Sequence, residues 1–573
     1  MNDILAKTID EHVPKFTKEV VDGLATTYIP QAPRFIEEVV KNAMKSATPL
    51  LEYRGWREAT PEETVAAMMG AKNTVSKIDM SRSDVYLILL FFRYDGVDLP
   101  PSKLLVPFVG EGGTMHISGT KYHNVPVLTD TVISPTKDMV FVRLHRDKLT
   151  FDRGMYNILI NGRRQVSQVI YSDIYRNSRV DGNRSGITTP IIIYLMAKYG
   201  FKETFRKYAG IVVDIIYEKP QQGATVSYTG FDVYSSTKLK PARSKTKVYH
   251  GHDAHILAPS DDDIDNEAKE FIENSAAGII YTFDMYPQFA KDIVSSIVSG
   301  KLDEEKRYWT VVLGTLINND AFTIDLMYGN AVDHLKSVEH YTDSFIRDRL
   351  ATIDIHIENF FDLLSVILIR YTSWVLTSKT YSNNIMNRYI DILYYVLYEI
   401  IVGIHIALLE ITRKTERKVQ KPTEVNHILT TKLSYRKIFR VTSHLSTMLV
   451  DCAGDNKYPK ITSILELQEL GDGVKKSKNT VIPEAAKSLS ASDVSTGSIL
   501  FVPKRIPSPK VRANPFMTIN VATGRFAPTE EMQRTVQALN TLISGVNRKE
   551  LSASAAELEI DIDTDDNKDL FDD

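Results

Sequence analysis

The chain has 573 residues, of which 43% are hydrophobic and 25% are charged, and its formal net charge is -3. This length is too great for one compact core and predicts several domains, and the composition is that of a folded protein rather than a disordered one. Cys452 is the single cysteine, which excludes an intramolecular disulfide framework and a multi-cysteine zinc site and fits a reducing cytoplasm.

The first part of the chain predicts helices followed by strands. Residues 1–80 have apolar positions at spacings of three and four, which indicates helices. After them come five apolar runs that predict strands: Val85–Phe92, Lys103–Val109, Val125–Asp130, Met139–Leu144 and Asn157–Ile160. Asn161–Gly162 follows the last run and predicts a hairpin turn. The glycines of Val109–Thr114 lack the Gly-Lys-Ser/Thr of a phosphate loop, so a turn is expected there.

The next part of the chain combines helices, short strands and a basic loop. Thr189–Gly210 predicts two helices separated by Gly200. Short strands are expected in residues 211–257, with a basic loop at Lys238–His255. The loop contains three histidines: His250, His252 and His255. They could form a metal cluster, but closely spaced histidines in a loop are more often exposed to solvent, and that interpretation is favoured.

A long helical region is predicted from Glu267 to Arg417. The acidic segment Asp261–Phe271 at its start suits the positive end of a helix dipole and lacks the glycine and final glutamate of a calcium loop. Ile392–Ile411 is the most apolar segment of the chain. Four polar residues lie in or beside it: Asp391, Glu399, His405 and Glu410. A buried helix is therefore expected there rather than a membrane span.

The C-terminal part is basic first and acidic last. Tyr435–Val450 predicts an amphipathic helix whose three cations are expected on a solvated face rather than in a phosphate-facing stripe: Arg436, Lys437 and Arg440. The four prolines in Ser488–Asn520 argue against a regular helix or a central strand. Residues 557–573 hold nine acidic residues and one lysine, a balance of -8 that leaves +5 for the rest. Such a tail either solubilises a protein, or competes for a basic surface, or binds a partner.

Five segments form an ordered set along the chain: Val125–Asp130 (VPVLTD), Ile158–Gln168 (ILINGRRQVSQ), Ile187–Tyr208, Glu339–Leu350 and the stretch from Ser488 with KRIPSP and RANP. Together they resemble the N-terminal half of the β subunit of multisubunit RNA polymerases. In that family an Ile-Pro-Leu-Met-Thr-Asp-like strand leads into Ile-Asn-Gly, an arginine and Val-Ser-Gln. His340 and Arg349 are the nearest counterparts of the histidine and arginine of the family's fourth segment, although they stand farther apart than its motif requires.

The chain also departs from the family pattern. Thr131–Asn157 separates the first two segments, where cellular β subunits have only a few residues. This insertion contains a predicted strand and a cluster of basic residues: Arg143, Arg146, Lys148 and Arg153. The family's second half, with its nucleotide-contacting lysines, does not follow the fork-like stretch. Giant bacteriophages of the phiKZ type encode their β and β′ equivalents as separate polypeptides, and the chain resembles the N-terminal β fragment of such an enzyme.

The resemblance implies an α+β multidomain fold with mixed β/α protrusion-like and lobe-like domains, a large helical region and an irregular proline-rich fork-like segment. The expected boundaries are 1–80 for a helical N-terminal region, 81–185 for a protrusion-like β-rich part, 186–417 for a lobe-like part that is helical in its second half, 418–485 for a helical return to the protrusion, 486–530 for the fork-like segment, and 531–573 for a C-terminal helix and the acidic tail.

The implied function is that of a subunit of a phage DNA-dependent RNA polymerase, which forms one side of the DNA cleft and transcribes phage genes within the complex. The expected partners are a C-terminal β-like fragment, β′-like fragments, the DNA template and the RNA product, and no membrane. The family's aspartate-rich metal loop is absent from this sequence, so no catalytic residue, metal site or cofactor is expected on the chain. Mg²⁺ is expected on the β′-like subunit, where it would support two-metal chemistry. The complex would act in the cytoplasm of the infected bacterial host or in the phage virion.

Basic residues of the fork-like and hairpin segments are the candidate nucleic-acid contacts. The first set stands among prolines, which would hold the side chains on a stiff loop where they neutralise phosphates. It comprises Lys504, Arg505, Lys510 and Arg512. The second set lies where the family's segment approaches RNA, and it comprises Arg163, Arg164 and Gln168. An exposed linker and a plain surface hairpin are the alternatives for these segments. For the whole protein, a virion structural protein and a stand-alone nucleic-acid-binding module remain alternative functions.

Overall fold

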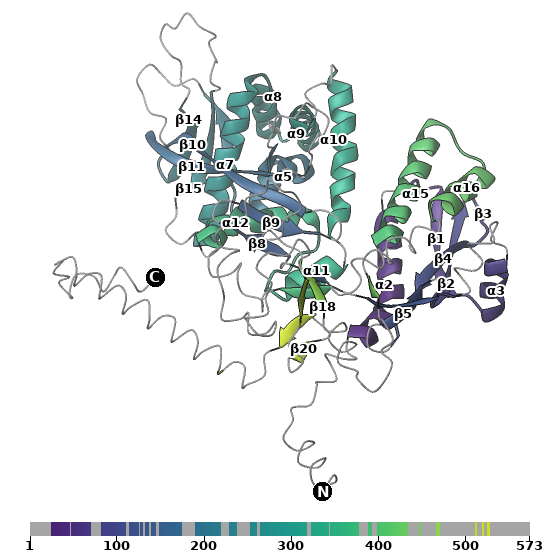
Figure 1. The fold of residues 1–573 in the computed structure, drawn as a ribbon. Helices are drawn as coiled ribbons and strands as arrows, with labels where there is room; N and C mark the ends of the chain where they lie inside the picture. The colour runs from purple at the N-terminus through teal and green to yellow at the C-terminus, as the bar shows by residue number, and fades with distance from the viewer. Residues whose placement is uncertain are drawn as a thin grey trace, which may run out of the picture.

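The computed structural model shows a multidomain α+β protein, as the sequence predicts (Figure 1). It describes residues 24–45, 47–69, 82–110, 114–117, 119–124, 127–129, 132–136, 139–144, 148–172, 174, 189–218, 228–237, 253–260, 264–317, 323–342, 344–376, 388–391, 398–433, 446–448, 466–469, 510–512, 518–520, 524–527 and 534. Two bodies with separate hydrophobic cores account for most of these residues, and a smaller sheet joins segments from both halves of the chain.

The first body combines two distant parts of the chain. Its N-terminal part contains two helices and four strands: α2 (Leu24–Met44), β1 (Leu51–Glu58), α3 (Pro61–Met69), β2 (Val85–Tyr94), β3 (Val97–Asp98) and β4 (Ser102–Pro107). Two later helices pack on this part: α15 (Tyr398–Arg417) and α16 (Pro422–Lys432). Strand β2 pairs antiparallel with β1, β3 and β4 and forms the centre of a four-stranded sheet.

The unbroken apolar run of β2 follows from the burial of both faces of this sheet. Ile88 and Leu90 belong to a core that they share with α2, α15 and α16. Leu87 and Leu89 alternate with them and pack on the other face, against Ala67 of α3. A strand that is covered on both sides has no polar face, so its sequence does not alternate.

The second body is built on an eight-stranded sheet. Its strands are β8 (Ile133–Pro135), β9 (Met139–Arg143), β10 (Lys148–Ile160), β11 (Arg163–Ser172), β12 (Thr189–Pro190), β13 (Asp214–Tyr217), β14 (Phe231–Ser236) and β15 (Ala254–Pro259). Its helices are α5 (Ile192–Tyr199), α6 (Phe201–Ala209), α7 (Asn266–Met285), α8 (Pro287–Val298), α9 (Leu302–Ile317), α10 (Ile324–Val338), η3 (Glu339–Tyr341), α11 (Ser344–Ala351) and α12 (Phe360–Leu376). Helix α7 lies against β10, β11 and β14 and carries the buried Phe283, which stacks on Trp309 of α9.

Local sequence signals explain the turns of the second body. Asn161 and Gly162 have φ angles of 51° and 75°, which is the left-handed pair that a two-residue hairpin turn requires, and β10 and β11 pair on either side. Gly200 separates α5 from α6 with a φ of 85°, and a Cβ there would lie 2.6 Å from Leu302 Cδ1. Both predictions, the hairpin and the helix break, are confirmed.

The second body is inserted into the first. Its core residues run from Val132 to Tyr389, whereas the core of the first body takes residues from Ala32–Ile117 and again from Ile404–Leu433. The chain therefore leaves the first body, builds the second, and returns through α15 and α16 (Figure 1). A three-stranded sheet of β5 (Thr114–Ile117), β6 (Thr120–Asn124) and β17 (Ser446–Met448) also joins early and late residues.

The junction sheet has six strands in the order β19-β18-β7-β16-β21-β20. They are β7 (Val127–Thr129), β16 (Tyr389–Asp391), β18 (Glu466–Glu469), β19 (Lys510–Arg512), β20 (Thr518–Asn520) and β21 (Arg525–Ala527). The two outer strands, β19 and β20, come from the proline-rich region, which agrees with the argument from proline against a central strand there. The described part of this region is nevertheless strand rather than irregular structure, which corrects the expectation in part.

Two other predictions about secondary structure are wrong. Leu51–Glu58 is a strand, although helices were expected throughout residues 1–80, because it pairs with a strand distant in sequence. Ser446–Met448 is likewise a strand inside the predicted helix Tyr435–Val450, and it pairs with β6. The predicted strand in Val125–Asp130 is present as β7, and it lies in a different sheet from Ile158–Gln168 because it pairs with β16 and β18.

The apolar segment Ile392–Ile411 contributes to α15, whose buried face packs against α2 and α16. Four residues form that face: Ile404, Ala407, Leu408 and Ile411. Within the described ranges, the structure contains no helix that is both long and apolar enough to cross a membrane.

Candidate nucleic-acid interface

Two of the predicted contacts, Arg163 and Arg164, lie at the start of β11 directly after the hairpin turn, and we refer to them as the hairpin tip. Both side chains are exposed, and neither guanidinium pairs with a carboxylate in the described part of the chain. Asn161 fixes the turn on β14, because its Nδ2 donates to Asp232 Oδ1 at 2.7 Å and its Oδ1 accepts from the backbone of Val233 at 2.8 Å. The hairpin tip therefore combines a fixed backbone with unpaired positive charge.

The third predicted residue of this strand, Gln168, already has a partner. Its Nε2 donates to Thr372 Oγ1 of α12 at 2.6 Å, so the amide ties the hairpin to a helix. In the antiparallel register, Gln168 faces Met155, and Val166 lies on the same side of the sheet. Met155 and Val166 are 62% and 64% exposed, so this side is apolar as well as basic.

The predicted contacts in the fork-like segment are divided between described and undescribed residues. Lys510 and Arg512 begin and end β19, at the edge of the junction sheet, where their register partners on β18 are Gln468 and Glu466. An acidic residue is thus the cross-strand neighbour of Arg512. The other two, Lys504 and Arg505, lie outside the described residues. The same holds for the three helical cations considered above: Arg436, Lys437 and Arg440.

One of the three loop histidines, His255, is buried in β15 rather than exposed, which corrects the favoured interpretation. Its Nδ1 lies 2.7 Å from Ser235 Oγ and its Nε2 lies 3.2 Å from the carbonyl oxygen of Glu218, and burial lowers its pKa. The other two histidines of the predicted cluster, His250 and His252, are not described. Among the residues that are, no group of three His, Cys, Asp or Glu side chains is arranged to hold a metal ion.

The counterpart of the family's arginine, Arg349 on α11, is engaged inside the molecule. Its Nη2 pairs with Asp391 Oδ2 at 2.9 Å, and its Nη1 donates to the Tyr389 hydroxyl at 2.9 Å. The guanidinium also lies 4.3 Å from the centroid of the Tyr389 ring. Arg349 therefore fastens the second body to β16 of the junction sheet. The side chain of its companion, His340, is not described.

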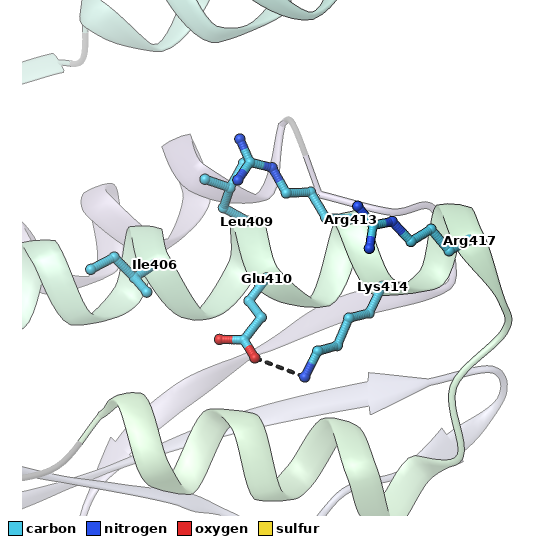
Figure 2. A pocket seen from close by; sticks show the side chains of 6 residues that line it. All are labelled: Ile406, Leu409, Glu410, Arg413, Lys414 and Arg417. Atoms are coloured by element: carbon cyan, nitrogen blue, oxygen red, sulfur yellow. Dashed lines mark ion pairs between the residues drawn. The ribbon is translucent and has the colours of Figure 1, made fainter. Parts of the chain in front are cut away.

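A surface that the sequence did not single out lies on α15 (Figure 2). It is a hollow of about 320 Å³ lined by Ile406, Leu409, Glu410, Arg413, Lys414 and Arg417. Leu409, Arg413 and Arg417 project from the side of α15 that points away from α16, whereas Glu410 and Lys414 lie on the side toward it (Figure 2). We call Ile406, Leu409, Arg413 and Arg417 the α15 surface.

The charges around this hollow are not balanced. Glu410 pairs with Lys414 at 2.8 Å and with Lys432 of α16 at 3.2 Å, and these two ammonium groups lower its pKa. Arg413 and Arg417 are exposed and have no carboxylate partner among the described side chains. Since they are four residues apart on a helix, they lie on one face and can bind one extended anion together. Two further exposed lysines follow, at positions 418 and 421.

A sequence signal for this surface exists, but it is ambiguous. Ile406, Arg413 and Arg417 recur at helical spacing on one face of the predicted helix. Basic residues in a last helical turn also have a plain structural explanation, because they complement the helix dipole. Arg413 and Arg417 are recognised as available charges only because Glu410, the nearby carboxylate, is already paired with Lys414 and Lys432. The contact with Lys432 is tertiary, so the sequence of the helix alone does not show it.

The described residues thus form two nested bodies, and the arginines of the hairpin tip and of the α15 surface are exposed without a carboxylate partner among the described side chains. A comparison with protein-family models matches residues 1–520 to the family described as non-virion RNA polymerase subunit. The chain belongs to this family. It is therefore a subunit of an RNA polymerase, and its partners include the other subunits of that enzyme. A search of curated proteins returned no match.

Proposed function

We propose that this chain is the N-terminal part of a split β subunit of a giant-phage RNA polymerase and that it forms one side of the DNA cleft. The observation that carries the proposal is the insertion of one body into the other. The sequence resemblance implies a lobe-like part followed by a return to a protrusion-like part, and the chain returns to its first body through α15 and α16 in this way. The core of the inserted body begins at Val132, inside the range 81–185 assigned to the protrusion-like part by resemblance.

The contacts to nucleic acid would be electrostatic and independent of sequence. Arg413 and Arg417 of the α15 surface and the arginines of the hairpin tip are exposed and unpaired within the described structure, so they can neutralise phosphates without first breaking an ion pair. Each neutralised phosphate releases condensed counterions, which makes the affinity fall as the salt concentration rises. Lys504, Arg505, Lys510 and Arg512 remain proposed contacts of the fork-like segment.

The chemistry of RNA synthesis would take place on other subunits. We assign Mg²⁺ to the β′-like subunit, where two-metal catalysis of nucleotide transfer would occur, and we assign to this chain the positioning of DNA and RNA. A C-terminal β-like fragment and β′-like fragments would complete the enzyme. The description of the family as non-virion favours action in the cytoplasm of the infected host over action in the virion.

Reconstitution tests this function. The polymerase subunits encoded by the same phage are co-expressed with and without this chain, purified through a tag on a different subunit, and assayed for RNA synthesis on phage promoter DNA. The proposal predicts that the chain co-purifies in fixed stoichiometry and that synthesis requires it. Full synthesis without the chain, or a chain that binds DNA tightly on its own but joins no complex, would overturn the proposal and support a stand-alone binding module.

A further inference from the structure

The apolar part of the α15 surface fits a partner other than nucleic acid. Ile406 and Leu409 are 39% and 50% exposed, and they line the same hollow of about 320 Å³ as Arg413 and Arg417. A phosphate backbone offers charge to the arginines but no aliphatic group to the hollow. A peptide in which acidic and aliphatic residues alternate offers both, and exposed apolar patches with a charged rim are typical of peptide-binding surfaces.

A segment with this composition is present in the same chain. Residues 557–573 read ELEIDIDTDDNKDLFDD, with nine acidic residues and one lysine. Their aliphatic and aromatic residues stand between the acids: Leu558, Ile560, Ile562, Leu570 and Phe571. The segment thus complements the α15 surface in both charge and apolar character.

We propose that residues 557–573 dock on the α15 surface of their own chain and exclude nucleic acid from it. The aliphatic side chains of the segment occupy the hollow at Ile406 and Leu409, and its carboxylates pair with Arg413 and Arg417. The docking stands independently of the proposed function. The exclusion of nucleic acid rests on that function, since it requires the α15 surface to contact DNA or RNA.

The length of the connection permits this contact. The last residue that the structure describes is Arg534, and 23 residues lead from it to Glu557. An extended chain of that length spans about 75 Å, whereas a compact protein of this size has a radius of gyration of about 25 Å. A tethered segment also acts at an effective concentration of about a millimolar, so even a weak site is occupied. Because the arginines are exposed, the docking weakens as salt screens the charges.

The first test measures docking without nucleic acid. A fluorescent peptide of residues 557–573 is titrated into the full chain, in which the nine acidic residues of the tail have been changed to their amides so that the tail itself competes only weakly for the site. We expect the peptide to bind about tenfold more weakly after Arg413→Gln with Arg417→Gln. This change corresponds to a loss of about 1.4 kcal/mol of binding free energy, which is reasonable for two exposed ion pairs. Arg163→Gln with Arg164→Gln, which removes two equally unpaired arginines elsewhere, should leave the affinity unchanged.

Two outcomes overturn the docking. One concerns the arginines. Equal affinity for all three proteins would show that Arg413 and Arg417 do not bind the peptide, and equal loss in both double variants would show that the affinity depends on total charge rather than on the α15 surface. The other concerns the hollow: a peptide with Ile560→Ser and Ile562→Ser keeps its charge and should bind several-fold more weakly. Unchanged affinity of that peptide would show that the aliphatic residues do not occupy the hollow.

The second test addresses competition. Binding of a fluorescent DNA duplex is compared between the natural full chain and the chain with the amide tail, at low and at physiological salt. We expect tighter binding by the amide-tail chain and suppression of that gain by added peptide. If the peptide docks but the tail does not alter DNA binding, the docking holds while the assignment of the α15 surface to nucleic acid fails.

Discussion

The interior of the second body and the α15 surface of the first body use their charged groups in opposite ways. In the second body, Asp284 is buried and accepts a hydrogen bond from Tyr156, and the buried Glu305 accepts one from the backbone at the start of α6. In the first body, Arg413 and Arg417 stay exposed and unpaired within the described structure. The difference separates two roles, because buried charges that hold elements together determine folding, whereas unpaired surface charges are available to ligands. Substitutions in the buried interior of the second body should therefore affect stability, and substitutions on the α15 surface should affect binding.

The largest expected effect comes from Gly314 in α9. A Cβ at this position would lie 2.1 Å from the carbonyl oxygen of Met327 in α10, and a backbone atom cannot move aside without displacing the helix. Gly314→Ala should therefore reduce the free energy of unfolding by about 3–5 kcal/mol, at the upper end of the cost of overpacking. Urea unfolding followed by circular dichroism measures this change.

Gly329 in α10 provides the matched control. It also lies inside a helix, but nothing lies within 4 Å of a Cβ added there. Gly329→Ala should leave the stability unchanged or raise it by up to about 1 kcal/mol, since alanine is the better helix former. A similar loss of stability from both substitutions would contradict the close approach of α9 and α10.

A somewhat smaller effect is expected where the second body meets the junction sheet. The Asp391 side chain is 5% exposed, so Arg349→Met would remove the Arg349 guanidinium from a buried ion pair, at a cost of about 3 kcal/mol. Arg347→Met on the same helix is the control, because among the described residues Arg347 approaches a backbone carbonyl at 3.5 Å and forms no ion pair. Unfolding curves that coincide for the two variants would contradict the conclusion that Arg349 stabilises the contact between α11 and β16.

The pH dependence of stability tests the polar interior of the second body. Burial lowers the pKa of His334, which contacts the Tyr194 hydroxyl, to about 4. The unfolded chain then binds the proton more tightly, so the stability is complete above about pH 6.5 and is lost as the pH falls toward 4. This group alone should make unfolding about 2 kcal/mol easier at pH 5 than at pH 7.5. His334→Gln should show a correspondingly smaller difference between the two pH values, and an unchanged difference would contradict the assignment.

The smallest effect on stability is expected at the α15 surface. Arg413→Gln with Arg417→Gln should change the free energy of unfolding by less than about 0.5 kcal/mol. In the assembled polymerase, the same variant should reduce the slope of log affinity for DNA against log salt by about 2. Lys202→Gln with Arg206→Gln on α6 removes two exposed cations that already have carboxylate partners and should leave the slope unchanged. A large loss of stability in the α15 variant would show that Arg413 and Arg417 stabilise the fold, and this would contradict their assignment as surface charges available to ligands.

Features with a local cause could be predicted from the sequence. Asn161–Gly162 specifies its turn through the φ angles of two adjacent residues, and Gly200 stops a helix for the same kind of reason. Strand β2 was found because both of its faces are covered, which leaves an unbroken apolar run. Pairings between distant segments could not be predicted. Leu51–Glu58 becomes a strand only because β2 is its neighbour, and β7 finds its partners at β16 and β18.

The candidate site shows the same division. The arginines of the hairpin tip were identified from a local motif, and the structure leaves them exposed. The burial of His255 depends on β14 and on the carbonyl of Glu218, neither of which is visible in a run of closely spaced histidines. Arg413 and Arg417 stand out only after Glu410 is seen to pair with Lys432 of a different helix. Such contacts decide which charges are free, and sequence patterns do not report them.

The central claim is that this chain forms one side of the DNA cleft of its polymerase. Site-specific photocrosslinking tests it most directly. A photoreactive amino acid is placed at position 413, or at position 206 as a control, in the chain with the amide tail, within a reconstituted, transcribing complex on labelled DNA. We expect crosslinks from position 413 to the DNA and none from position 206. A complex that transcribes fully but gives no DNA crosslink from position 413 or from the hairpin tip would contradict it.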